Sequence, residues 1–236
     1  MMGSIDLSGI TAISFDGDGT LWDFQAAMRG ALADALAELG RLMPCEQVAG
    51  LTVAGLIRLR DAVEEEWRGR RVRLEDIRLE SFRRTLAQVG VQDEALAQHL
   101  HAFYMERRFA GILLYADVLP ALDALARRYR VGLVSNGNTY PERCGLAGRF
   151  HFVLFAQDCG YSKPDPRMFA CALKRAGCPA GQLLHVGDSL TNDVQGARDA
   201  GIRAVWLNRT GAPNDTDVVP DVEVATLMEL VALLAE

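Results

Sequence analysis

Patterns that hold metals or disulfides through sulfur and imidazole groups are absent from this sequence. Its 236 residues include five cysteines, an odd number without a C-x-x-C pair, so we expect neither a disulfide framework nor a cysteine-ligated zinc site. The four histidines form no H-x-x-x-H pattern, which argues against a metal held by imidazole groups. The cysteines are therefore expected to be reduced and structural.

Long apolar runs and an excess of positive charge are also missing. No stretch of about 18 apolar residues and no charged-then-apolar leader occurs, so we expect no membrane span, no secretory signal and a cytoplasmic location. The net charge is −6, whereas nucleic-acid-binding proteins typically carry a basic surface, so no nucleic-acid partner is expected. Half of the residues are hydrophobic, which is enough to bury a substantial core.

Two carboxylates follow the first apolar run of the chain. Ile10–Phe15 is uncharged and is predicted to form a buried strand, and Asp16 and Asp18 come directly after it, with Thr20 two residues further. Ligand sites in open α/β sheets lie beyond the carboxyl ends of such strands. The two acids are therefore expected to face a crevice at the edge of a sheet.

Two later segments offer groups that suit a phosphate. The apolar run Val131–Ser135 ends in a hydroxyl, and Asn136 and Gly137 follow it in a turn whose backbone N–H groups can hold phosphate oxygens. Lys163 lies in a loop that two prolines stiffen, and Pro166 is expected to open a helix. Lysine is scarce in this chain, which has only two lysines among 25 basic residues, so an ammonium group in this loop favours a specific role.

A second pair of acids follows another predicted strand. Leu183–Gly187 runs into a glycine turn, after which Asp188 lies at the strand end and Asp193 in the first turns of the next helix. Carboxylate oxygens are ligands that Mg²⁺ prefers. This segment therefore supplies candidate ligands for a divalent cation.

The four segments, in this order, resemble the haloacid dehalogenase (HAD) superfamily, specifically its phosphatase branch with a helical cap. The resemblance covers about residues 10–21 and 110–236. It implies that Asp16 is the nucleophile, that Asp18 is the general acid and base, and that the cofactor is Mg²⁺. It also implies that Ser135 and Lys163 take part in catalysis, and that the substrate is bound by Thr20, Ser135, Asn136, Gly137 and Lys163. The implied metal-binding residues are Asp16, Asp18, Asp188 and Asp193. Among these, Asp193 would support either the metal or Lys163.

One position departs from the family pattern. The family usually carries a larger apolar residue where this chain has Gly17, and a glycine there is expected to loosen the loop that aims Asp16.

The residues themselves suit hydrolysis of a phosphate monoester, because that reaction needs charge neutralisation and an in-line nucleophile. Attack by Asp16 would divide one displacement into two easier ones through an aspartyl-phosphate. Asp18 would protonate the leaving alkoxide and then take a proton from water, and Lys163 would supply positive charge. The predicted substrate is a small phosphorylated metabolite.

The pattern of apolar residues predicts an α/β fold, with a doubly wound, mostly parallel, Rossmann-like core sheet and an inserted α-helical cap. The predicted core comprises residues 1–22 and 110–236, and the cap comprises residues 23–109. Helices are expected in the cap at Ala26–Leu39, Glu46–Trp67, Leu74–Val89 and Asp93–Arg108, and in the core at Val118–Tyr129, Arg167–Ala176, Thr191–Ala200 and Val224–Ala235.

Several other functions are weighed against a phosphatase. A dehalogenase of the same superfamily generally lacks the second acid, so Asp18 argues against it, and a phosphonate-cleaving relative needs a cap lysine, which this chain does not have. A calcium-binding loop is excluded because the twelfth position from Asp16 is Ala27 rather than Glu. A sugar phosphomutase and a non-enzymatic aspartyl-phosphate switch remain alternatives.

Specificity is expected to come from the cap, which can exclude water and recognise the group that carries the phosphate. The sequence does not identify that group. Candidate contacts are the hinge aromatics and the basic run that follows Trp67, although a packing patch and a solvated turn are the simpler interpretations. These candidate residues are Trp22, Phe24, Arg68, Arg70, Arg71 and Arg73.

Overall fold

The computed structural model describes residues 7–235, and residues 1–6 and 236, which the predicted core includes, lie outside the described residues. The chain divides into two compact units. One contains residues 1–23 and 114–236, and the other is the continuous segment Phe24–Leu113. No helix in the described part of the chain combines the length and the apolar character needed to span a membrane.

The first unit is built on a parallel sheet in the order β3-β2-β1-β4-β5-β6. Its strands are short, and most of their residues are buried, as expected of a parallel sheet covered on both faces. This arrangement confirms the predicted fold class. In chain order the strands are β1 (Ala12–Phe15), β2 (Arg130–Ser135), β3 (Phe152–Phe155), β4 (Leu183–Gly187), β5 (Arg203–Leu207) and β6 (Val222–Val224).

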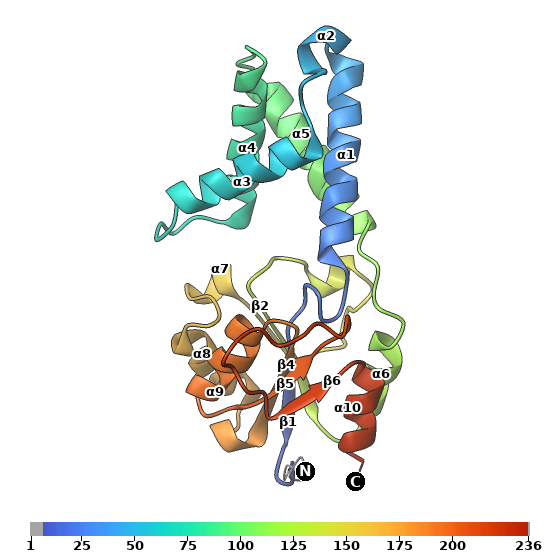
Figure 1. Cartoon of the computed structure of the whole chain (residues 1–236), viewed down its shortest axis with the longest axis vertical. Helices are drawn as coiled ribbons and strands as arrows, with labels where there is room; N and C mark the ends of the chain where they lie inside the picture. The colour runs from blue at the N-terminus through green and yellow to red at the C-terminus, as the bar shows by residue number, and fades with distance from the viewer. Residues whose placement is uncertain (1–6, 236) are drawn as a thin grey trace. The chain divides into compact units, whose positions relative to one another are not determined.

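Helices cover both faces of this sheet, with α8 and α9 on one side and α6 and α10 on the other (Figure 1). Pro166 is the first residue of α8, as predicted, and the side chain of Asp165 caps that helix by accepting a hydrogen bond from the backbone N–H of Arg167. The helices of this unit are α6 (Val118–Leu125), α7 (Ala156–Cys159), α8 (Pro166–Ala176), α9 (Gly196–Asp199) and α10 (Leu227–Leu233), with 3₁₀ turns at Pro141–Arg143 and Ala180–Gln182.

Three predicted helices of this unit differ in the structure. The one expected as Val118–Tyr129 ends at Leu125. The segment expected as Thr191–Ala200 begins earlier as a π-helical turn, Leu190–Gln195, and only Gly196–Asp199 is α-helical. The segment expected as Val224–Ala235 contains the end of β6 before the shorter helix α10. Thr226 separates the strand from the helix, because its side chain accepts a hydrogen bond from the N–H of Glu229 as an N-cap.

The second unit consists of helices around a core of its own. Met28, Leu39, Phe82, Leu100 and Tyr104 are buried together in that core. The helix predicted at Glu46–Trp67 is interrupted in the structure after residue 48 and resumes at residue 53, because Thr52 adopts an extended conformation and caps the second part. The helices are α1 (Phe24–Leu42), α2 (Cys45–Val48), α3 (Val53–Glu66), α4 (Leu74–Gln88) and α5 (Glu94–Ala110).

Candidate active site

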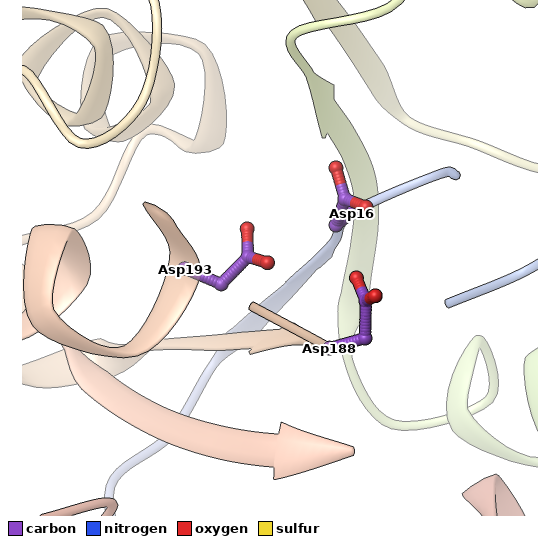
Figure 2. A group of neighbouring side chains, drawn as sticks. All are labelled: Asp16, Asp188 and Asp193. Atoms are coloured by element: carbon purple, nitrogen blue, oxygen red, sulfur yellow. The ribbon is translucent and has the colours of Figure 1, made fainter. Parts of the chain in front are cut away.

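The candidate site lies where three neighbouring strands of the parallel sheet end. β1 pairs with β2 on one side and with β4 on the other, and Phe15 is in register with Leu133 and Val186. Asp16 follows β1 directly and Asp188 follows β4. Figure 2 shows Asp16, Asp188 and Asp193 extending from three different segments at this edge. The edge is the position at which open α/β sheets bind ligands.

Lys163 lies between two of these carboxylates. Its Nζ is 2.6 Å from Asp16 Oδ1 and 2.6 Å from Asp193 Oδ1, and Lys163 is only 3% exposed. Burial alone would lower the pKa of this ammonium group, but the charges of Asp16 and Asp193 outweigh it and raise its pKa above the usual value. The lysine is therefore a fixed positive charge beside Asp16.

The two carboxyl groups that share Lys163 differ in electrostatic character. Burial raises the pKa of Asp16 well above its usual value, against the opposing charge of Lys163. Burial also tends to raise the pKa of Asp193, but the charge of Lys163 and a hydrogen bond from His185 hold that pKa below its usual value. Asp193 is thus a permanent carboxylate, whereas the charged form of Asp16 needs further positive charge to stabilise it.

His185 is a member of this network that the sequence did not identify. It lies within β4, is fully buried, and its Nε2 is 3.1 Å from Asp193 Oδ1 while its Nδ1 is 2.8 Å from Ser14 Oγ. Burial lowers its pKa, so the ring is neutral, and the carboxylate partner assigns the ring hydrogen to Nε2. A histidine inside the apolar run Leu183–Val186 is the sequence signal that could have revealed it.

The side chain of Asn136, which was predicted to contact the substrate, pairs with the backbone of Lys163. Its Nδ2 donates to the carbonyl oxygen of Lys163 at 2.9 Å, and its Oδ1 accepts from the N–H of Lys163 at 2.8 Å. This two-way pairing fixes the backbone of the lysine loop against the end of β2. Asn136 therefore positions Lys163.

Ser135, Gly137 and Asp18 lie close together. Ser135 Oγ accepts from the N–H of Gly137 at 3.0 Å. A Cβ at position 137 would lie 2.6 Å from Asp18 Oδ2, so only glycine lets the loop after β2 approach that oxygen. The arrangement places a hydroxyl, backbone N–H groups and a second carboxyl group beside the nucleophile candidate.

Thr20 contacts an acid where a substrate contact had been predicted. Its Oγ1 lies 3.4 Å from Asp188 Oδ1, and the threonine is fully buried. The Asp188 side chain keeps an exposed surface, yet partial burial and the nearby charge of Asp193 raise its pKa to about 6. Asp188 is therefore the carboxylate of this group that is open to an incoming cation.

Asp16, Asp188 and Asp193 each offer an oxygen within 4.8 Å of the others, close enough to hold one metal ion. Asp193 is the poorest candidate ligand of the three. Its Oδ1 is engaged by Lys163 and His185, and its Oδ2 accepts from the N–H of Ser189 at 3.0 Å. The geometry favours the second of the two roles predicted for Asp193, which is to support Lys163.

The candidate specificity residues have ordinary structural partners. Trp22 is fully buried, and Phe24 packs against the core of the helical unit. Among the arginines of the basic run, Arg68 pairs with Glu65, Arg70 lies over the ring of Trp67 at 5.9 Å and Arg73 pairs with Glu75 at 3.6 Å. All four arginines of the run are exposed, as in a solvated turn.

Comparisons with known proteins agree with this geometry. The family model of haloacid dehalogenase-like hydrolases matches residues 10–201. The chain is 30% identical over 236 residues to the 5-amino-6-(5-phospho-D-ribitylamino)uracil phosphatase YigB of Escherichia coli, which covers 97% of this chain and 98% of that protein. It is 36% identical over 154 residues to the phosphoserine phosphatase of Thermus thermophilus, over 63% of this chain and 61% of that protein.

A solved structure extends the likeness to the whole fold. The 2-haloacid dehalogenase from Pseudomonas syringae pv. Tomato DC3000 matches with a TM-score of 0.80 and 34% identity, covering 96% of this chain and 98% of the other. Since the family model spans most of the sequence and includes every element of the site from Asp16 to Asp193, this chain belongs to the haloacid dehalogenase-like hydrolases.

Proposed function

We propose that this enzyme hydrolyses phosphate monoesters of small metabolites, using Mg²⁺ and an aspartyl-phosphate intermediate on Asp16. The observation that carries the proposal is the buried ammonium group of Lys163, 2.6 Å from Asp16 Oδ1, with Asp18 two residues beyond. A phosphate dianion needs positive charge beside the nucleophile and a proton for its leaving group. The names of two relatives, a ribitylaminouracil phosphatase and a phosphoserine phosphatase, support the same reaction class.

The donor set fits Mg²⁺. Asp16 and Asp188 would hold the ion, with the backbone carbonyl of Asp18 as a further ligand, and all of these donors are the hard oxygens that Mg²⁺ prefers. Burial raises the pKa values of both Asp16 and Asp188, with the charge of Asp193 adding to the effect, so a bound cation would stabilise their charged forms. When bound, the ion would neutralise part of the charge on the phosphate.

The residues would then divide the reaction into two steps. In the first, an Asp16 oxygen bonds to phosphorus while the bond to the leaving oxygen breaks, and Asp18 gives that oxygen a proton. In the second, Asp18 takes a proton from water as the water oxygen attacks phosphorus and Asp16 is released. Lys163 holds positive charge beside the transferring group in both steps.

Asp18 also separates this proposal from dehalogenation, the activity in the name of the similar Pseudomonas structure. A halide leaves without a proton, so a dehalogenase has no need for an acid at this position. A screen of phosphorylated metabolites, with haloacids included, would test the assignment. We expect phosphate release from at least one metabolite and no halide release, and halide release without phosphate release would contradict the proposal.

A phosphomutase and a phosphorylation switch are the alternatives that this screen also addresses. A mutase would return an isomerised sugar phosphate with little free phosphate, and a switch would hold its phosphoryl group for long periods.

We propose further that the unit Phe24–Leu113 acts as a cap that selects the substrate.

Activity on an aryl phosphate is expected to require Mg²⁺. Chelation should abolish it, and Ca²⁺ should restore it poorly because Ca²⁺ takes more ligands in a looser geometry than an in-line displacement tolerates. Zn²⁺ should likewise fail to restore full activity. Phosphate release before and after chelation and metal return measures this, and full activity in excess chelator would remove the metal from the mechanism.

Magnesium is expected to raise the melting temperature more at about pH 7.5 than at about pH 5. The pKa of Asp188 is raised to about 6. A raised carboxyl pKa stabilises the folded protein at low pH, and this contribution is lost as the pH rises through about 6, where the carboxylate becomes available to the metal. Thermal melts with and without Mg²⁺ measure the shift. Asp188→Asn is the control in which the pH dependence should shrink, and equal shifts at both pH values in the unmodified protein would contradict the ligand assignment.

A further inference from the structure

We propose that Trp22 positions the carboxyl group of Asp18 for proton transfer, and that the absence of a side chain at Gly17 makes this possible. The proposal rests on the proposed function, because it assigns a partner to the general acid of that reaction. Trp22 would be a positioning residue that acts through Asp18. It adds a residue to the first acid motif that the resemblance to the HAD family does not include.

The contact is short and partly buried. Trp22 Nε1 donates to Asp18 Oδ1 at 2.6 Å, and Trp22 is 0% exposed. An indole N–H can donate but cannot accept, so it favours an unprotonated oxygen as its partner. When Asp18 carries a proton, that proton is therefore directed to Oδ2.

Backbone hydrogen bonds hold the ring and the carboxyl group in one closed turn. The N–H groups of Leu21 and Trp22 donate to the carbonyl oxygen of Gly17 at 2.8 and 3.3 Å, and the N–H of Gly19 donates to the carbonyl oxygen of Trp22 at 2.8 Å. Arg209 also stabilises the turn, because its guanidinium group donates a hydrogen bond to the carbonyl oxygen of Thr20 at 2.9 Å. The position of the indole relative to Asp18 is thus fixed locally.

Gly17 provides the space that the indole occupies. A Cβ at this position would lie 2.5 Å from Cζ2 and 2.9 Å from Cη2 of Trp22, well inside contact distance. Because Trp22 is fully buried, its ring has no room to move aside. The departure from the family pattern at Gly17 therefore does not loosen the loop, as the sequence suggested, but lets a rigid ring pack against it.

The second oxygen of Asp18 lies beside the loop that follows β2. Asp18 Oδ2 is the atom that a Cβ on Gly137 would meet at 2.6 Å, so it borders the loop that follows Ser135. The proton on Oδ2 would pass to the leaving alkoxide oxygen as the bond from that oxygen to phosphorus breaks. In the second step the same oxygen would take a proton from water as Asp16 is released. Loss of the indole N–H removes the donor that holds Oδ1 and should weaken both transfers.

The test compares two kinds of leaving group in Trp22→Phe, which removes the N–H and keeps an aromatic ring. The value of kcat/KM reports on steps up to phosphorylation of Asp16. With an alkyl phosphate, whose leaving group needs a proton, we expect kcat/KM to fall at least about tenfold. This loss is smaller than the loss of about 10² to 10⁴ expected for Asp18→Asn, which removes the acid itself. With p-nitrophenyl phosphate, whose leaving group needs none, the fall should be no more than about threefold. Trp67→Phe, the same substitution in the helical unit, should change neither value.

Gly17→Ala provides a second route to the same contact. It should lower kcat/KM for the alkyl phosphate by displacing the indole. The double variant with Trp22→Phe should have a kcat/KM no lower than that of the more impaired single variant, because both changes remove the same interaction. Proton–nitrogen NMR checks the contact without turnover, because Asp18→Asn should move the indole signal of Trp22 and leave that of Trp67 in place.

The outcomes separate this proposal from the proposed function. An active enzyme in which Trp22→Phe lowers kcat/KM equally for both substrates, or for neither, overturns the role of Trp22 and leaves the phosphatase assignment intact. An unmoved indole signal in Asp18→Asn overturns the contact itself. Wild-type protein that releases phosphate from neither substrate contradicts the proposed function, and the role of Trp22 falls with it.

Discussion

Asp16→Asn is expected to lower phosphate release by about 10⁴-fold or more and to leave the protein as stable as the wild type or more stable. The amide cannot attack phosphorus, so the covalent intermediate is lost. Burial raises the pKa of Asp16, which means that its charged form is costly in the folded protein at neutral pH. A neutral amide of the same shape removes that cost, and Lys163 keeps Asp193 as its partner.

Steady-state kinetics, the mass of the acid-quenched protein and a thermal melt measure the three parts of this prediction. Asp18→Asn is the matched control, because it keeps the nucleophile and should still form the phosphorylated protein with a good leaving group. Near-normal turnover in Asp16→Asn would show that another group attacks phosphorus. A large fall in melting temperature would show that the Asp16 charge contributes to stability.

Lys163→Met is expected to abolish activity and to lower the free energy of unfolding by about 3 to 5 kcal/mol. The substitution removes the ammonium group that lies 2.6 Å from both Asp16 and Asp193 and leaves two buried carboxyl groups without a neighbouring positive charge. Denaturant unfolding and kinetics measure the two effects. The matched control is Lys174→Met, since Lys174 is the other lysine of the chain and is exposed on α8. An unchanged stability in Lys163→Met would contradict the buried ion network.

Lys163→Arg distinguishes charge from shape. A guanidinium group is planar and wider than an ammonium group, and the lysine is 3% exposed, so the larger group cannot occupy the same point between two carboxylates. We expect at least about a tenfold loss of activity, or roughly 1.4 kcal/mol of transition-state stabilisation. Wild-type activity in this variant would show that positive charge alone suffices at position 163.

The strands that position the site could be predicted because apolar runs stop at polar residues. Ile13 and Phe15 precede Asp16 in one such run, and the same pattern identified β2 and β4. The break near Gly50 was missed because helical spacing of apolar residues continues across it from Glu46 to Trp67. β6 was missed because three residues, Val222–Val224, are too few to show a period of two before a longer helical pattern begins.

Within the site, residue types could be predicted but their partners could not. Asn136 and Thr20 have side chains that suit a substrate, and nothing in their neighbourhood in the sequence reveals that they contact Lys163 and Asp188. The contact of His185 with Ser14 joins residues 171 positions apart. The contact of Trp22 with Asp18 is local, yet it depends on the exact path of the turn, which a sequence pattern does not determine.

The place of β1 in the middle of the sheet has a consequence for how the protein is made. Ile13 leaves the ribosome before its strand partners, Val131 and Leu184, which are more than 100 positions later in the chain. The unit Phe24–Leu113, which has its own core, is synthesised between β1 and these partners and can fold during synthesis. β1 cannot pair until β2 and β4 have been synthesised. Asp16 is therefore translated well before the strands that flank it, so a nascent chain that ends before Leu183–Gly187 is expected to lack catalytic activity.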